Sequence, residues 1–173
     1  MLPVGALVAA AAVVARQPMS PPKSAQADVR LRDGAASVDA LVAAFFDALA
    51  AKDAKALRRL RVTEDEYTRF VIPGNVEPGE PAQEANEQTS GYFWGSLHGK
   101  SAAYEDDLLT RFGGKKLAVL ERTDSGSHTY AAFTAIKRLR FQVKEEDGSE
   151  VEVATGSVIG ADGQFKFVSF IRD

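Results

Sequence analysis

The side chains best suited to chemistry are one histidine and several aromatic residues. His98 can transfer protons near neutral pH because its unperturbed pKa lies in that range, and Trp94 lies one helical turn before it. Tyr67 and Tyr130 supply hydroxyl groups that could orient a bound molecule. We expect Tyr67, Trp94, His98 and Tyr130 to line a ligand-binding pocket. A simpler interpretation of His98 is a partly buried side chain that fills the mouth of a helical layer.

Carboxylates are less well placed for chemistry. Glu121, Glu150 and Glu152 fall at strand ends or on the strand face opposite the small polar residues. Asp47 is predicted to be exposed, and Glu66 to be occupied by a helix cap. An enzyme that abstracts a proton beside a carbonyl needs a carboxylate or similar base in its pocket. The pattern therefore favours a binding module over such an enzyme.

The composition excludes several other kinds of site. The chain has no cysteine and only two histidines, His98 and His128, so thiolate chemistry is impossible and we expect no metal site. We find no phosphate-binding glycine loop, dinucleotide fingerprint or Ser-His-Asp order, and we expect no cofactor. The net charge of −3 argues against a nucleic-acid partner. Residues 137–140 form a small basic cluster, which is either a solvated face or a site for an acidic partner.

Helix caps organise the chain before residue 73. Ser37 is a suitable N-cap for an amphipathic helix whose apolar residues run from Val38 to Leu49. Asp53 is expected to cap a short second helix. Thr63 and Glu66 match a capping box and predict a third helix. Pro73-Gly74 ends that helix, and residues 73–82 form a proline-rich loop.

Residues 83–112 are predicted to be helical with a break. Gly99 ends the first part, and Ser101 caps its continuation. Tyr104, Leu108 and Phe112 then recur at helical spacing, so they should form a stripe that faces the core.

The last third of the chain predicts an antiparallel meander of four strands. Turn-forming residues separate the predicted strands, which are Lys116–Arg122, Thr129–Lys144, Val151–Val158 and Gln164–Arg172. The apolar positions of the second strand change parity midway, which predicts a bulge or sharp bend near Lys137-Arg138. We therefore predict an α+β fold, with N-terminal helices packed on a bent four-stranded antiparallel sheet.

The N-terminal region resembles an export signal. Pro3 to Ala15 is apolar but too short to span a bilayer, and Ala25-Gln26-Ala27 has a form that signal peptidase accepts. A disordered alanine-rich tail is the alternative. We expect a signal peptide at 1–27, a flexible linker at 28–36 and one domain at 37–173. The processed protein would be periplasmic or secreted, without stable membrane insertion.

Two segments resemble one family. Val38 to Leu57 is similar to the first helix, and the Asp-started second helix, of the NTF2-like superfamily, and Gln164 to Asp173 to its final strand. This superfamily includes ketosteroid isomerases and SnoaL-type polyketide cyclases. The resemblance covers Ser37 to Asp173 and implies a cone-shaped cavity for a small apolar ligand. Family members often carry a short strand or hairpin before the long helix, where this chain has a capped helix and a proline-rich loop. The chain is thus closest to exported variants of unassigned function.

Two functions follow from these observations. The first is an exported, non-catalytic module that binds a small molecule or a protein. The alternative is an isomerase, cyclase or dehydratase acting on a small apolar substrate, with His98 and either Tyr67 or Tyr130 as catalytic residues. The resemblance also implies a homodimer through the sheet. Its outer face would contribute four residues, provided that they are exposed: Phe133, Phe141, Val158 and Phe170.

Overall fold

The computed structural model describes residues 29–172 as helices packed against antiparallel strands. The helices are α1 (Val38–Ala50), α2 (Ala54–Arg59), α3 (Glu64–Glu66), the π-helix η1 (Tyr67–Val71), α4 (Ile72–Gly74) and α5 (Glu87–Phe112). The strands are β1 (Ala118–Thr123), β2 (Ser127–Thr129), β3 (Thr134–Ile136), β4 (Arg140–Lys144), β5 (Glu150–Ala154), β6 (Val158–Ala161) and β7 (Gln164–Phe167). The predicted α+β class is confirmed. The predicted signal peptide, 1–27, lies outside the described residues.

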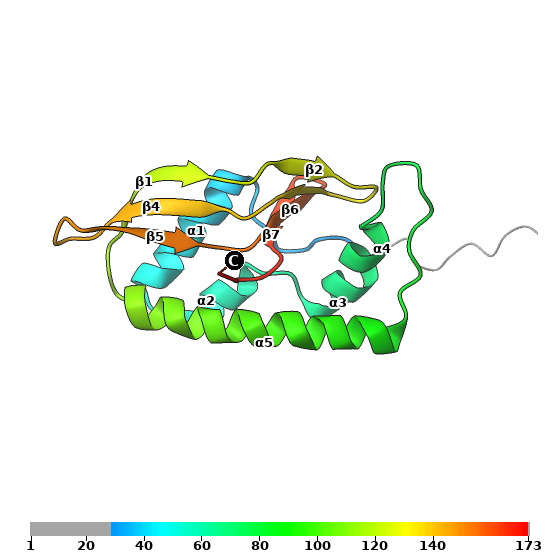
Figure 1. Cartoon of the computed structure of the whole chain (residues 1–173), viewed down its shortest axis with the longest axis horizontal. Coiled ribbons are helices and arrows are strands. Elements are labelled where there is room, and N and C mark those ends of the chain that lie inside the picture. The colour runs from blue at the N-terminus through cyan, green and yellow to red at the C-terminus, as the bar shows by residue number, and fades with distance from the viewer. Residues whose placement is uncertain (1–28, 173) are drawn as a thin grey trace, which may run out of the picture.

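The strands form two antiparallel sheets in place of the single four-stranded sheet that the sequence predicts. One sheet has the order β1-β4-β5 and the other β2-β3-β6-β7. The two sheets follow one another along the long axis of the molecule, and α5 runs the length of both (Figure 1). Because two of the predicted strands are each broken once, they appear as β3 with β4 and as β5 with β6.

The first hairpin lies later than the sequence predicts. Residues 123–127 were expected to reverse the chain, but they form only a kink between β1 and β2, with Gly126 at a φ of 95°. The reversal follows β2, where the Tyr130 amide donates to the Phe133 carbonyl at 2.8 Å. A glycine at positive φ permits a kink as readily as a turn, so the sequence pattern did not distinguish them.

The breaks in neighbouring strands lie beside each other. The amide of Ser125 donates to the carbonyl of Lys137 at 2.8 Å, and the amide of Thr155 donates to Leu139 at 2.8 Å. Arg138 has a φ of 52°, in the left-handed region that few residues other than glycine adopt. The bend predicted near Lys137-Arg138 is therefore confirmed.

Two hydrophobic clusters lie on either side of this bend. The first, which we call the closed core, joins α1, α2 and the second half of α5 to β4 and β5, and it extends to Val158 of β6 and Phe167 of β7. Its fully buried members include Phe45, Leu108, Phe141 and Val153. The Tyr104 hydroxyl donates to the Ala154 carbonyl at 3.0 Å, so the predicted stripe on α5 faces this core.

The second cluster, which we call the open core, joins η1 to β3 and β6. Its buried members are Leu31, Val62, Val71, Phe133, Ala135 and Ile159. Partly buried aromatic side chains surround it, namely Tyr67, Phe70, Trp94 and Tyr130. This cluster is smaller than the closed core and has fewer fully buried side chains.

Helix α5 is continuous over 26 residues, so the predicted break at Gly99 is wrong. A glycine in a helix costs only about 1 kcal/mol relative to alanine, which a long helix tolerates. Ser101 is fully buried and is not an N-cap. Its hydroxyl accepts a hydrogen bond from the Phe170 amide at 2.8 Å, which binds the C-terminal segment to the helix.

The segment before α1, which was expected to be a linker, lies against the outer edge of β7. The amide of Ala35 donates to the Phe165 carbonyl at 3.0 Å, and the Phe165 amide donates back at 2.9 Å. The Val62 amide donates to Phe167 at 2.9 Å further along the same edge. Leu31 is also buried in the open core. Residues 29–36 therefore form part of the folded unit.

The side chains expected to support a dimer are not on an outer face. All four are buried, with exposed fractions of at most 5%: Phe133, Phe141, Val158 and Phe170. That expectation is wrong because Phe133 packs in the open core, whereas Phe141, Val158 and Phe170 pack in the closed core. The large apolar side chains that are exposed lie on α5 and β1: Tyr92, Phe93, Val119 and Leu120. Within residues 29–172, no helix is long and apolar enough to span a membrane.

Candidate functional site

The open core contains a cavity of about 320 Å³ between η1, α4 and the sheet. This volume lies at the lower end of the range for small-molecule sites. Most of the lining is apolar or aromatic, with polar groups at a few positions. The lining residues are Tyr67, Val71, Ile72, Asn75, Tyr130, Phe133, Ala135, Lys137, Arg138, Ser157, Ile159 and Val168.

The helical wall of the cavity depends on a wide turn. In η1 the Ile72 amide donates to the Tyr67 carbonyl, five residues earlier, which defines a π-helical turn. Pro73 follows directly; it has no amide hydrogen, and its ring crowds the carbonyl four residues before it. The wider turn provides space for that ring. Tyr67, Val71 and Ile72 all line the cavity as a result.

The sheet wall follows from strand alternation. Ala135 is the central residue of β3, and Phe133 and Lys137 directly precede and follow that strand. The three lie two residues apart along extended chain and all line the cavity. Ile159 lies opposite Ala135 on β6 and contributes to the same wall. Ser157, two residues before Ile159, extends this wall to the sheet bend. The polar groups of the lining at the bend are thus those of Lys137, Arg138 and Ser157.

The proline-rich loop closes one end of the cavity against the hairpin between β2 and β3. The Ala131 amide donates to the Val76 carbonyl at 2.9 Å. The side chains of His128 and Glu77 meet at 3.0 Å between Nε2 and Oε1. A Cβ at Gly74 would overlap the side chain of Ala132, so a close approach of α4 to the hairpin requires glycine there.

Two of the predicted site residues, Tyr67 and Tyr130, meet in this cavity. Burial raises the pKa of Tyr67, so its hydroxyl is protonated at neutral pH and can donate a hydrogen bond. The ring of Tyr130 packs between those of His128 and Phe133, with centroid distances of 4.5 and 5.1 Å. These contacts hold the Tyr130 ring in a defined orientation.

The other two predicted residues, Trp94 and His98, lie outside the lining. Trp94 is partly buried behind Tyr67, with ring centroids 5.6 Å apart. His98 is exposed on α5 and packs against Trp94, at 5.4 Å between centroids. Trp94 therefore supports a cavity residue, whereas His98 is not among the lining residues.

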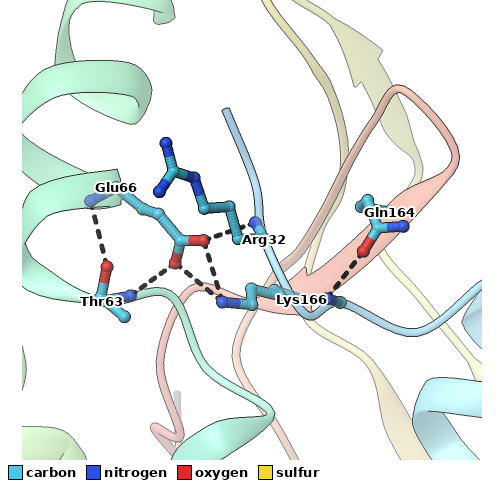
Figure 2. A network of polar contacts seen from close by, with 6 residues as sticks. Arg32, Thr63, Glu66, Gln164 and Lys166 are labelled. Atoms are coloured by element: carbon cyan, nitrogen blue, oxygen red, sulfur yellow. Dashed lines mark hydrogen bonds and ion pairs between the residues drawn. The ribbon is translucent and has the colours of Figure 1, made fainter. Parts of the chain in front are cut away.

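A buried ion pair that the sequence did not predict stands beside the cavity. Lys166 lies opposite Ile159 in the sheet, and its Nζ donates to both carboxylate oxygens of Glu66 at 2.9 Å. Glu66 also accepts from the amides of Arg32 and Thr63, each at 2.8 Å (Figure 2). The capping box predicted for Thr63 and Glu66 is confirmed. The capping-box pattern predicts the contact between the Glu66 carboxylate and the Thr63 amide. No local pattern predicts a contact between Glu66 and a lysine 100 residues away.

The environment of Glu66 makes it a weak base. Burial by itself raises the pKa of the carboxyl group, but hydrogen bonds from Thr63, Lys166 and Arg32 outweigh burial and hold the pKa below its ordinary value. The anion therefore persists at neutral pH and is fully hydrogen-bonded. Such a carboxylate stabilises the fold and has little tendency to take up a substrate proton.

A second buried cluster joins α2 to α5. The Arg58 Nε donates to Glu105 Oε1 at 2.8 Å, while Arg61 Nη1 lies 4.0 Å from Glu105 Oε2. Burial lowers the pKa of the Arg61 guanidinium, and the Glu105 charge opposes that effect. Within the described residues, Arg61 Nε and Nη2 and Glu105 Oε2 have no hydrogen-bond partner. These atoms are closed off from solvent, so no ligand can reach them in this conformation.

The polar groups of the cavity lining are few and of several kinds. The lining supplies phenol, amide, hydroxyl and cationic groups but contains no Asp, Glu or His. Across residues 29–172 no group of three metal-ligating side chains is found. The sequence did not identify Asn75, Lys137 or Ser157 as lining residues. For Lys137, two signals could have done so: the parity change near it and the basic cluster at residues 137–140.

Comparisons with known proteins find no relative of this chain. No protein-family model matches it, and neither a curated protein nor a solved structure does.

Proposed function

We propose that this protein is a non-catalytic module that binds a small, largely apolar molecule in the cavity of the open core. The observation that carries the proposal is the cavity itself, walled by Val71, Phe133 and Ile159 with two phenol groups among them. Apolar walls with a few polar groups are typical of small-molecule sites. The walls supply affinity by burial, and the hydroxyl groups of Tyr67 and Tyr130 orient the ligand.

The proposed architecture is that of an exported NTF2-like domain. It is supported by the order of the elements, since helices precede an antiparallel meander that bends sharply at Arg138. A cavity between helices and sheet is what the resemblance implies. Export remains a proposal that depends on residues 1–27.

The enzymatic alternative has less support. Proton transfer in an isomerase or cyclase needs a base within hydrogen-bond reach of the substrate. His98 lies outside the cavity, and the nearby Glu66 carboxylate is held by Lys166 and backbone amides. Burial raises the pKa of Tyr67, so its hydroxyl is protonated at neutral pH and is not available as a base.

Native mass spectrometry of protein purified from its own host tests the proposal. We expect a retained small molecule, detected as a discrete added mass that is released on denaturation. The variant Ala135→Leu should lose this mass because the larger side chain fills the cavity from the centre of its sheet wall. Retention of the circular dichroism spectrum would show that this variant remains folded.

The matched control is Ala118→Leu, the same substitution at an exposed position on β1. It should retain the added mass. A protein that carries no added mass, and whose Tyr130 and Phe133 NMR signals respond to no member of a small-molecule library, would refute the proposed function. Turnover of a ketone substrate that Tyr67→Phe abolishes would instead favour the enzymatic alternative.

A further inference from the structure

We propose that the ligand of this cavity is a small organic carboxylate, with its apolar body against Phe133 and its carboxylate at Lys137. This inference rests on the proposed function and adds the chemical class of the ligand. It follows from how polar and apolar groups are distributed along the cavity and from the charges of its lining.

The cavity has an apolar end and a polar end. Tyr130 and Phe133 lie at the hairpin, whereas Lys137, Arg138 and Ser157 lie at the sheet bend. Four residues of extended chain separate Phe133 from Lys137, which corresponds to about 13 Å along the strand. A molecule that spans this length has one end among aromatic rings and the other beside cations.

The charged groups in the lining are of one sign. Lys137 and Arg138 are both cationic, and no acidic residue lines the cavity. The whole chain has a net charge of −3, so this local excess does not reflect a basic protein. Within residues 29–172, no carboxylate lies within ion-pair distance of Lys137, whereas the equally cationic Lys166 is paired with Glu66.

Backbone geometry directs the lysine toward the site. Lys137 follows Ala135 on the same face of β3, and both line the cavity. The left-handed conformation of Arg138 comes immediately after it and changes the parity of the chain. Leu139 consequently faces the closed core, so the side chains of this segment that line the cavity end with Lys137 and Arg138.

The physical reason for an anion is the balance between desolvation and pairing. A carboxylate loses water contacts on entering an apolar cavity, and this loss is unfavourable unless a charge or donor replaces them. The ammonium group of Lys137 is exposed at the mouth, so it can pair with the carboxylate without itself being buried. The Ser157 hydroxyl at the same end can donate a hydrogen bond. A neutral amide of the same shape can accept a hydrogen bond from the ammonium group but gains no charge pairing.

Ligand-observed NMR with matched pairs tests the inference. The probes are a library of small aromatic and aliphatic carboxylic acids, each paired with its primary amide, including 2-naphthoate and 2-naphthamide. We expect the acids that bind to exceed their amides in affinity by about tenfold, as one charge-assisted contact provides. In Lys137→Gln this preference should fall to about twofold or less, while the affinity of the amides stays unchanged.

The matched control is Lys100→Gln, which removes an exposed lysine from α5 away from the cavity. It should preserve the preference for acids. Acids and amides that bind equally well, or a preference that survives Lys137→Gln, would overturn the inference and leave the proposed function standing. If neither acids nor amides bind at millimolar concentration, the proposed function fails together with the inference.

Discussion

The closed core and the open core are built on the same bent strands but differ in how completely they are filled. In the closed core, Phe45, Phe141 and Phe170 are fully buried, and aromatic rings pack on one another at 5 to 6 Å. In the open core, Tyr67 and Tyr130 are only partly buried, and a cavity remains between helix and sheet. The difference indicates that one end of the molecule provides stability and the other a space for a ligand.

One backbone position separates these two regions. Ala135 and Phe133 face the open core, whereas Leu139 and Phe141 face the closed core. An unbroken strand could not present both sets inward to helices on opposite sides. The left-handed residue Arg138 makes this change possible. The bend thus allows the same strand to contribute side chains to both hydrophobic cores.

The largest effect is expected from Phe141→Ala. The side chain is fully buried in the closed core, so its removal should lower the free energy of unfolding by about 3–5 kcal/mol. Tyr130→Ala, at the partly exposed wall of the open core, should cost about 1 kcal/mol. Urea denaturation of both variants measures the contrast. Equal losses would show that the two cores do not differ as described.

A loss of about 3 kcal/mol is expected from Glu66→Gln, because it leaves the ammonium of Lys166 buried without its counter-charge. Adding Lys166→Met should recover part of that loss. A double-mutant cycle by denaturation measures the coupling between the two sites. If the two substitutions lower the free energy of unfolding additively, Glu66 and Lys166 are not coupled, and their ion pair does not stabilise the contact between helix and sheet.

Gly156→Ala should destabilise the protein by about 1–3 kcal/mol, since an added methyl group must displace its neighbours. A Cβ at this position at the bend would overlap the backbone carbonyl and side chain of Ser169. The thermal midpoint is the measurement. An unchanged midpoint would indicate that the C-terminal segment can move away from the bend without cost.

The pH dependence of stability should carry the signature of Glu66. Its folded-state pKa lies below the ordinary value of 4.5, so its contribution is fully present above that pH and is lost as the pH falls through the lower, folded-state pKa. Denaturation at a series of pH values from 6 downward should show a steeper loss in wild type than in Glu66→Gln. The exposed Asp147, whose pKa is also lowered chiefly by hydrogen bonds from Ser149, has the same sign and provides a comparison through Asp147→Asn. Identical slopes in wild type and Glu66→Gln would contradict the role assigned to the buried pair.

The smallest effect is expected from Gly95→Ala on α5. A Cβ there meets no atom within 4 Å, and alanine favours the helix by up to about 1 kcal/mol. A modest rise in the thermal midpoint is therefore expected. A lower thermal midpoint would show that the added methyl group disturbs packing between this half of α5 and the open core.

Local signals were sufficient for much of the fold. The caps at Ser37 and Asp53 occur where the sequence predicts them, since a cap involves residues only three positions apart. The apolar stripe of α1 and the exposure of Asp47 follow from helical periodicity in the same way. The bend at Arg138 was also predictable, because the apolar positions of the strand change from even to odd numbers there.

The remaining features depend on contacts between distant residues. Ser101 is suited to an N-cap, but burial against Phe170 assigns its hydroxyl a different role. Phe133 and Phe141 alternate as an outer face would, yet Phe133 packs in the open core and Phe141 in the closed core. The cavity was expected to include His98, but a continuous α5 places that residue outside it. None of these outcomes is encoded in a short stretch of sequence.

The contacts between residues 30–35 and the segment around β7 affect the order in which the protein folds. The Gly34 amide donates to Gln164 across 130 positions of chain, and Arg30 pairs with Asp162 across 132. Bringing such distant residues together carries a large loop-closure entropy, and contacts of this range slow folding. On the ribosome, residues 30–35 must wait for nearly all of the chain to be synthesised before their partners emerge. Until then the edge that they cover is absent, and Leu31 has no core in which to be buried.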